Sequence, residues 1–81
     1  MQTENWPESV KFELSPGHYD IVGSTEEAAR LLLSEWPVSS GAKFLEAKAT
    51  CIDVLSGRLP ADFARRAFIA ACEEADMHVM T

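Results

Sequence analysis

Two cysteines are the side chains of this 81-residue chain that are best suited to nucleophilic or redox chemistry. Cys51 and Cys72 lie far apart, with no CxxC spacing and no nearby pair of histidines, so they form neither a zinc nor a redox motif. Both fall in segments with helical periodicity, where a buried cysteine usually packs without reacting. Cys72 lies at the edge of its apolar stripe and is the better candidate for exposure. We expect two reduced thiols, offset by roughly 9 Å along antiparallel helices, which is too far for a disulfide.

The two histidines are the remaining candidates for a metal site. His18 lies beside a predicted turn and His78 lies near the end of the chain. They meet only if the end of the chain pairs with the second predicted strand, and two histidines without a third ligand bind metal poorly. We therefore expect both to face solvent.

Adjacent acids invite a general acid–base interpretation at two places, Glu26-Glu27 and Glu73-Glu74. Neighbouring positions on a helix point about 100° apart, so neither pair converges on one substrate. We expect the first pair to cap a helix and the second to lie on a solvated face, paired with Arg65 or Arg66. Because the glycines are single and scattered, a phosphate-binding loop is absent as well. The sequence thus predicts no catalytic residue, metal or cofactor, and an enzyme is the less favoured class.

Four residues are candidates for contact with a partner: Trp6, Lys48, Arg65 and Arg66. An exposed Trp6 would anchor a partner, whereas a buried one would close the core. Lys48 falls inside an apolar helical arc. We favour a stem that covers apolar surface while the amine reaches water, over an ion pair with an acid of a neighbour or a second subunit. Arg65-Arg66, the only basic doublet, either holds an anion or forms ion pairs such as Asp62–Arg66.

A β-hairpin is expected to begin the fold. Val10–Leu14 and His18–Val22 alternate between apolar and polar residues, and Pro16-Gly17 supplies a tight turn with positive φ at the glycine. Pairing Leu14 with Tyr19 and Phe12 with Ile21 puts the large apolar side chains on one face. We favour this register because a slip of one residue inverts the face.

Three helices should follow the hairpin. Ser24–Glu27 is a capping box, and the helix it begins stops near Trp36, before a proline. The second helix runs from about Gly41 to Ser56, capped by Ser39 or Ser40 and ended by Gly57. It is apolar over more than half its circumference, so we expect it to be the most buried helix, with neighbours on two sides.

The third helix begins at Pro60 and carries an apolar stripe, with Asp62, Arg65 and Glu73 facing away. Met77–Met80 is either a third strand on the hairpin or a tail. This order predicts one α+β domain over residues 1–81, an antiparallel hairpin packed on three helices. The expected core is Phe12, Leu14, Tyr19, Ile21, Leu32, Trp36, Leu45, Ile52, Leu55, Phe63, Ala67, Phe68 and Ala71.

Composition and charge restrict the partners. The formal net charge of −6 opposes binding to nucleic acid and to anionic membranes. No apolar run reaches the ~20 residues of a membrane span, and Met1–Asn5 lacks the features of a signal peptide, so we expect a cytoplasmic protein. A chain of 81 residues that is 47% hydrophobic often has a protein partner, and a second copy of itself is the expected one.

Three segments, in their order and spacing, resemble a small bacterial family known as domain of unknown function 982. They are Glu26–Leu32 followed by Trp36-Pro37, the Ala47, Cys51 and Leu55–Gly57 spacing, and Ala64–Ala71. The resemblance covers most of the chain and implies a compact domain. It carries over no activity and no site residues.

The favoured function is a non-enzymatic interaction or regulatory module that self-associates, through the open sheet edge or through helix residues such as Ile69. The alternative is a small-molecule-binding protein or modest enzyme, with a pocket between helices and sheet near Lys48, Cys72 and Arg65. A role in nucleic-acid binding ranks third.

Overall fold

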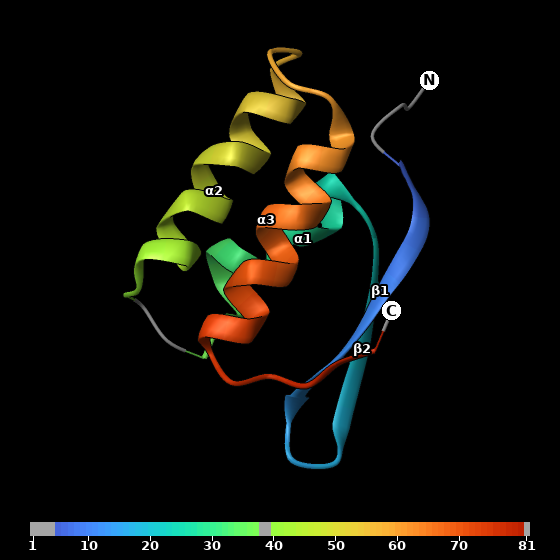
Figure 1. Ribbon diagram of the computed structural model, residues 1–81, viewed down its shortest axis with the longest axis vertical. Helices are drawn as coiled ribbons and strands as arrows, with labels where there is room; N and C mark the ends of the chain where they lie inside the picture. The colour runs from blue at the N-terminus through green and yellow to red at the C-terminus, as the bar shows by residue number, and fades with distance from the viewer. Residues whose placement is uncertain (1–4, 38–39, 81) are drawn as a thin grey trace.

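Two long strands precede three helices and a short third strand in the computed structural model, which describes residues 5–37 and 40–80. The strands are β1 (Asn5–Ser15), β2 (His18–Ser24) and β3 (Val79–Met80). The helices are α1 (Thr25–Ser34), α2 (Ala42–Leu55) and α3 (Ala61–Glu74). The sheet is antiparallel with the order β2-β1-β3. Figure 1 shows the hairpin of β1 and β2 beside the helices. The α+β class is confirmed.

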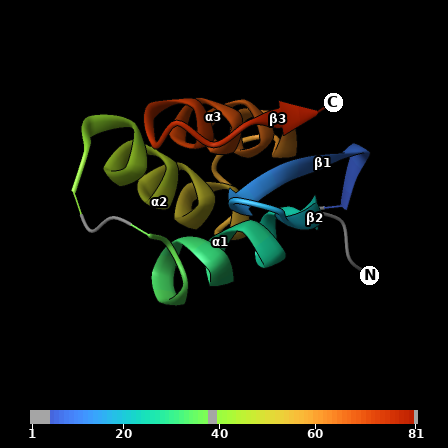
Figure 2. The same ribbon diagram turned by 90° about the horizontal axis from the view of Figure 1, so that it is seen from below.

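The elements form successive layers. Helices α1 and α3 pack against β2 and β1 respectively, while α2 packs mainly against α3 and α1. Figure 2 shows α2 on the side of the helices away from the sheet. One long side of α2 therefore has no neighbour among the described elements. No helix within residues 5–37 and 40–80 is long and apolar enough to cross a membrane.

The hairpin turn is as expected, but the predicted register is wrong. Gly17 has φ of 76° in the two-residue turn, whereas Phe12 lies opposite Asp20, and Tyr19 lies opposite Glu13. The pairing shifts between Glu13 and Ser15, which is a bulge that gives β1 one extra residue. The predicted register assumed regular pairing along both strands, and the extra residue in β1 shifts the pairing by one position. It turns both Tyr19 and Ile21 to the outer, exposed face of the sheet.

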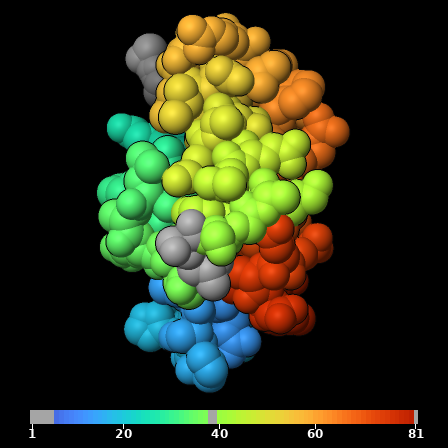
Figure 3. Space-filling view, turned by 90° about the vertical axis from the view of Figure 1, so that its left-hand side faces the viewer, coloured from blue at the N-terminus to red at the C-terminus, as the bar shows by residue number. Residues whose placement is uncertain are grey.

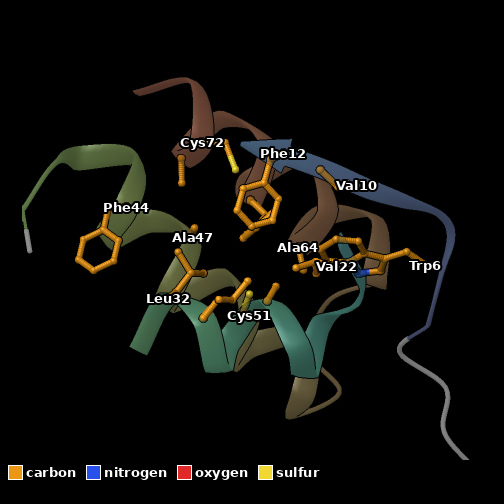
Figure 4. Close-up of a cluster of buried hydrophobic side chains, with 14 of the residues drawn as sticks. Trp6, Val10, Phe12, Val22, Leu32, Phe44, Ala47, Cys51, Ala64 and Cys72 are labelled. Atoms are coloured by element: carbon orange, nitrogen blue, oxygen red, sulfur yellow. The ribbon is translucent and has the colours of Figure 1, made fainter. Parts of the chain in front are cut away.

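The core therefore differs from the expected one. Phe12, Leu32, Phe68 and Ala71 are buried, and Leu14, Trp36 and Ala67 pack partly buried against them, as predicted. Figure 4 shows the buried side chains meeting between the sheet and the helices. Six residues expected in the core are exposed instead, because the neighbours of their elements lie on other faces: Tyr19, Ile21, Leu45, Ile52, Leu55 and Phe63.

Helix α1 begins with the expected cap. The Ser24 hydroxyl accepts a hydrogen bond from the Glu27 amide at 3.2 Å. The Glu27 carboxylate reaches one residue further back than expected and accepts from the Gly23 amide at 2.8 Å. Negatively charged carboxylates in the first turn also stabilise the helix, because they lie at the positive end of its dipole. The local sequence is therefore enough to place this helix start.

Helix α2 is capped from another helix. Its N-cap is Gly41, so the expected cap at Ser40 is wrong, because Ser40 lies one residue before it. Ser39, the other expected cap, lies outside the described residues. The Glu74 carboxylate of α3 accepts hydrogen bonds from the amides of Lys43 and Phe44, both at 3.0 Å. Glu74 is exposed, as expected, but the expected arginine partner is wrong, because its carboxylate binds the open amides of α2.

The end of the chain is the third strand. Pro60 precedes α3 as its N-cap, Ala75 follows α3 as its C-cap, and the next residue, Asp76, has a left-handed φ of 61°. The amides of Asp76 and Met77 donate to the carbonyls of Glu73 and Cys72 at 3.0 and 2.9 Å, which is a Schellman motif. This turn sends β3 to the open edge of β1, where Val79 pairs with Phe12. Since β1 separates β3 from β2, the expected route by which His18 and His78 meet is closed.

Candidate functional site

Trp6 belongs to the core. It is buried, and its indole Nε1–H donates to the Thr25 hydroxyl at 3.0 Å. Its ring packs on Phe68 with centroids 5.9 Å apart. The hydrogen bond and the ring contact join the start of β1 to the start of α1 and to α3. Trp6 is therefore unavailable as an exposed anchor.

The two arginines of the basic doublet point to different partners. Arg65 was expected to face away from the core, yet its side chain is only 20% exposed, and its Nε–H donates to the Glu8 carbonyl at 3.0 Å. Glu8 lies where the pairing of β1 with β2 is irregular, so Arg65 supplies a hydrogen-bond donor to a backbone carbonyl in this irregular stretch. Arg66 forms the expected ion pair with Asp62 at 2.9 Å. The doublet does not form a joint anion site.

Lys48 is half-buried on α2. Its ammonium lies 4.7 Å from the centroid of the Phe44 ring, a cation–π geometry. Within the described part of the chain it forms no ion pair at 4.0 Å or less. The side chain thus lies along apolar surface of its own helix.

Both cysteines are free and fully buried. Burial raises the pKa of Cys51 to about 11. Burial and the adjacent Glu73 carboxylate raise the pKa of Cys72 to about 12. The expectation that Cys72 is the more exposed cysteine is wrong, since it packs in the core beside Phe12 (Figure 4). At neutral pH both side chains are protonated thiols and poor nucleophiles.

Shallow clefts mark the surface of the described residues, and three of them are well formed. They lie between β2 and α1 (about 210 Å³), between the hairpin turn and the end of α3 (about 400 Å³), and between α2 and α3 (about 280 Å³). None is lined by Lys48, Cys72 or Arg65, the residues proposed for a pocket. Among residues 5–37 and 40–80, no three His, Cys, Asp or Glu side chains cluster as metal ligands.

The exposed side of α2 is the feature that residue-by-residue reasoning missed. Leu45, Ile52 and Leu55 are 53%, 53% and 44% exposed and, with Lys48, recur at three- and four-residue spacing. We name these four residues the α2 outer face. Figure 3 shows α2 running through the middle of one side of the molecule, beside α1. The signal was in the sequence as a helix apolar over more than half its circumference.

Comparison with known proteins agrees with the resemblance. The model of the family described as "Protein of unknown function (DUF982)" matches residues 8–79. The match covers most of the chain, so the chain belongs to that family. No curated protein and no solved structure gives a significant match.

Proposed function

We propose that this DUF982 protein is a non-enzymatic interaction module that pairs with a second copy of itself through the α2 outer face. One observation carries the proposal: α2 is apolar over more than half its circumference, and its neighbours α1 and α3 cover only part of that apolar surface. Phe44, Ala47, Cys51 and Val54 are buried against α1 and α3, while three large aliphatic side chains face outward. Contiguous exposed apolar surface of this kind is typical of a contact with another protein.

A second copy fits this surface for two reasons. The three- and four-residue spacing of the outer face is the spacing with which one helix packs against an identical one. The face holds a single charge, Lys48, whereas the chain as a whole carries −6. Two copies can therefore meet here without bringing their acidic side chains together. The free thiols and acidic surface further support a cytoplasmic setting for this module.

The energy of this contact suggests weak pairing. Burying the exposed half of each aliphatic side chain contributes about 1 kcal/mol, and six such side chains in a dimer contribute about 6 kcal/mol. Association costs about 4–15 kcal/mol in lost translational and rotational freedom. We therefore expect a dimer that forms only as the concentration rises.

The test is the solution mass by sedimentation and light scattering over a wide concentration range. We expect the mass to rise from 8.9 kDa toward twice that value. Ile52→Lys should keep the chain monomeric. Ile21→Lys is the matched control, because Ile21 is similarly exposed (58%, against 53% for Ile52) but lies on the sheet. A wild-type mass that stays at 8.9 kDa up to millimolar concentration would refute the proposal.

A further inference from the structure

Strand β2 forms one edge of the sheet, because the strand order is β2-β1-β3. Its inner side pairs with β1, and its other side pairs with no strand within the described residues. Such an edge presents backbone donors and acceptors to any extended chain, including β2 of a second molecule. An open sheet edge was one of the two contact surfaces expected from the sequence, the other being helix residues such as Ile69.

The hydrogen-bond pattern shows which amides face this edge. The Glu13 amide donates to the His78 carbonyl at 2.8 Å, so Glu13 points toward β3. Successive residues of a strand alternate in direction, so Phe12 and Val10 point toward β2 and bond with their partners Asp20 and Val22. By the same alternation, Tyr19, Ile21 and Gly23 on β2 point away from β1, to the open edge.

Two of these three outward amides, those of Ile21 and Gly23, are already occupied. The Ile21 amide donates to the Asp20 carboxylate at 2.8 Å. The Gly23 amide donates to the Glu27 carboxylate of α1, also at 2.8 Å. An added strand needs these two donors for its own carbonyl oxygens, and it would meet two negative charges in their place.

We propose that the carboxylates of Asp20 and Glu27 cap the β2 edge and prevent a second copy from pairing with it. The two acids come from different elements and bond alternate amides of the same edge, which is the arrangement that blocks a ladder. The mechanism works by competition for donors and by repulsion of incoming carbonyl groups. It is independent of the α2 outer face, so either proposal can fail alone.

The experiment uses the Ile52→Lys chain, so that the α2 outer face makes no contribution. Asp20→Ala/Glu27→Ala is compared with Glu26→Ala/Glu35→Ala, which removes the same charge from exposed acids that bond no β2 amide. By light scattering we expect the first variant to reach at least twice the monomer mass at concentrations where the control stays monomeric. Equal masses for the two variants would overturn the proposal.

Two further variants keep the test decisive. Asp20→Ala alone leaves the α1 cap intact, so it decides by the same mass criterion if loss of Glu27 prevents folding. Adding Ile21→Pro removes an edge donor without breaking the ladder to β1. It should return the associated variant to monomer mass. Association that survives this proline would mean that the contact lies elsewhere and would overturn the assignment to β2.

Discussion

Replacing Glu74 with alanine removes the two hydrogen bonds that cap α2 from α3. The Glu74 oxygens accept from the amides of Lys43 and Phe44, both at 3.0 Å, and the N-cap residue Gly41 has no side chain of its own to replace them. Loss of a side-chain cap costs about 0.5–2 kcal/mol. Two bonds to a charged acceptor, one of them partly buried, place this case near the upper end, at about 2 kcal/mol.

The assay is thermal and urea unfolding followed by circular dichroism. A loss of about 2 kcal/mol should lower the melting temperature of a domain of this size by about 10 °C. Glu74→Gln keeps one acceptor oxygen and should lose about half as much. Glu73→Ala is the matched control: its side chain is exposed beside Glu74 and should change stability by less than about 0.5 kcal/mol. If Glu74→Ala is no more destabilising than Glu73→Ala, the capping argument is refuted.

Three other changes have defined outcomes. Burial raises the pKa of Cys51 to about 11 and of Cys72 to about 12. The free energy of unfolding that these protonated thiols contribute is therefore fully present below the unfolded pKa near 9, and it is lost as the pH rises toward 11 and 12. Wild-type stability should fall more steeply above pH 9 than that of the double alanine variant, by up to about 1.4 kcal/mol per pH unit for each thiol; equal slopes in urea titrations would contradict this. Gly41→Ala places a Cβ 2.5 Å from a Glu74 oxygen at a φ of 125°, so it should lower the free energy of unfolding by about 2 kcal/mol or more. Additive effects in a double-mutant cycle with Glu74→Ala would count against a contact between the two residues. Asp76→Gly should raise stability by about 0.5–1 kcal/mol, since glycine adopts the φ of 61° without strain, and a lower melting temperature would contradict the Schellman assignment.

The proposed pairing through the α2 outer face and the proposed capping of the β2 edge together predict self-association that stops at a dimer. One surface offers aliphatic side chains at helical spacing, whereas the other has its donors occupied by Asp20 and Glu27. Directing association to a helix favours a closed dimer, whereas an open strand edge favours extended pairing. The two mass experiments test these surfaces separately.

The candidate surface was partly accessible from the sequence. The pattern of the second helix predicted neighbours on two sides, and α2 has them at α1 and α3. The same pattern placed Leu45, Ile52 and Leu55 in the core, where the structure does not put them. Apolar periodicity states how much of a helix is apolar, but the neighbour that covers each side is set by how the other elements pack.

Local sequence determined the features that depend on residues close together in the chain. Alternation identified the hairpin strands, Gly17 its turn, and Ser24 with Glu27 the start of α1, because strands, turns and caps involve contacts within a few positions. Only the tertiary structure decided what depends on distant residues. Glu74 caps α2 from about 30 residues away, Arg65 binds the Glu8 carbonyl of β1, and the bulge in β1 exposes Ile21. Such contacts form only when packing brings separate elements together, so they cannot be predicted from the spacing of residues along the chain.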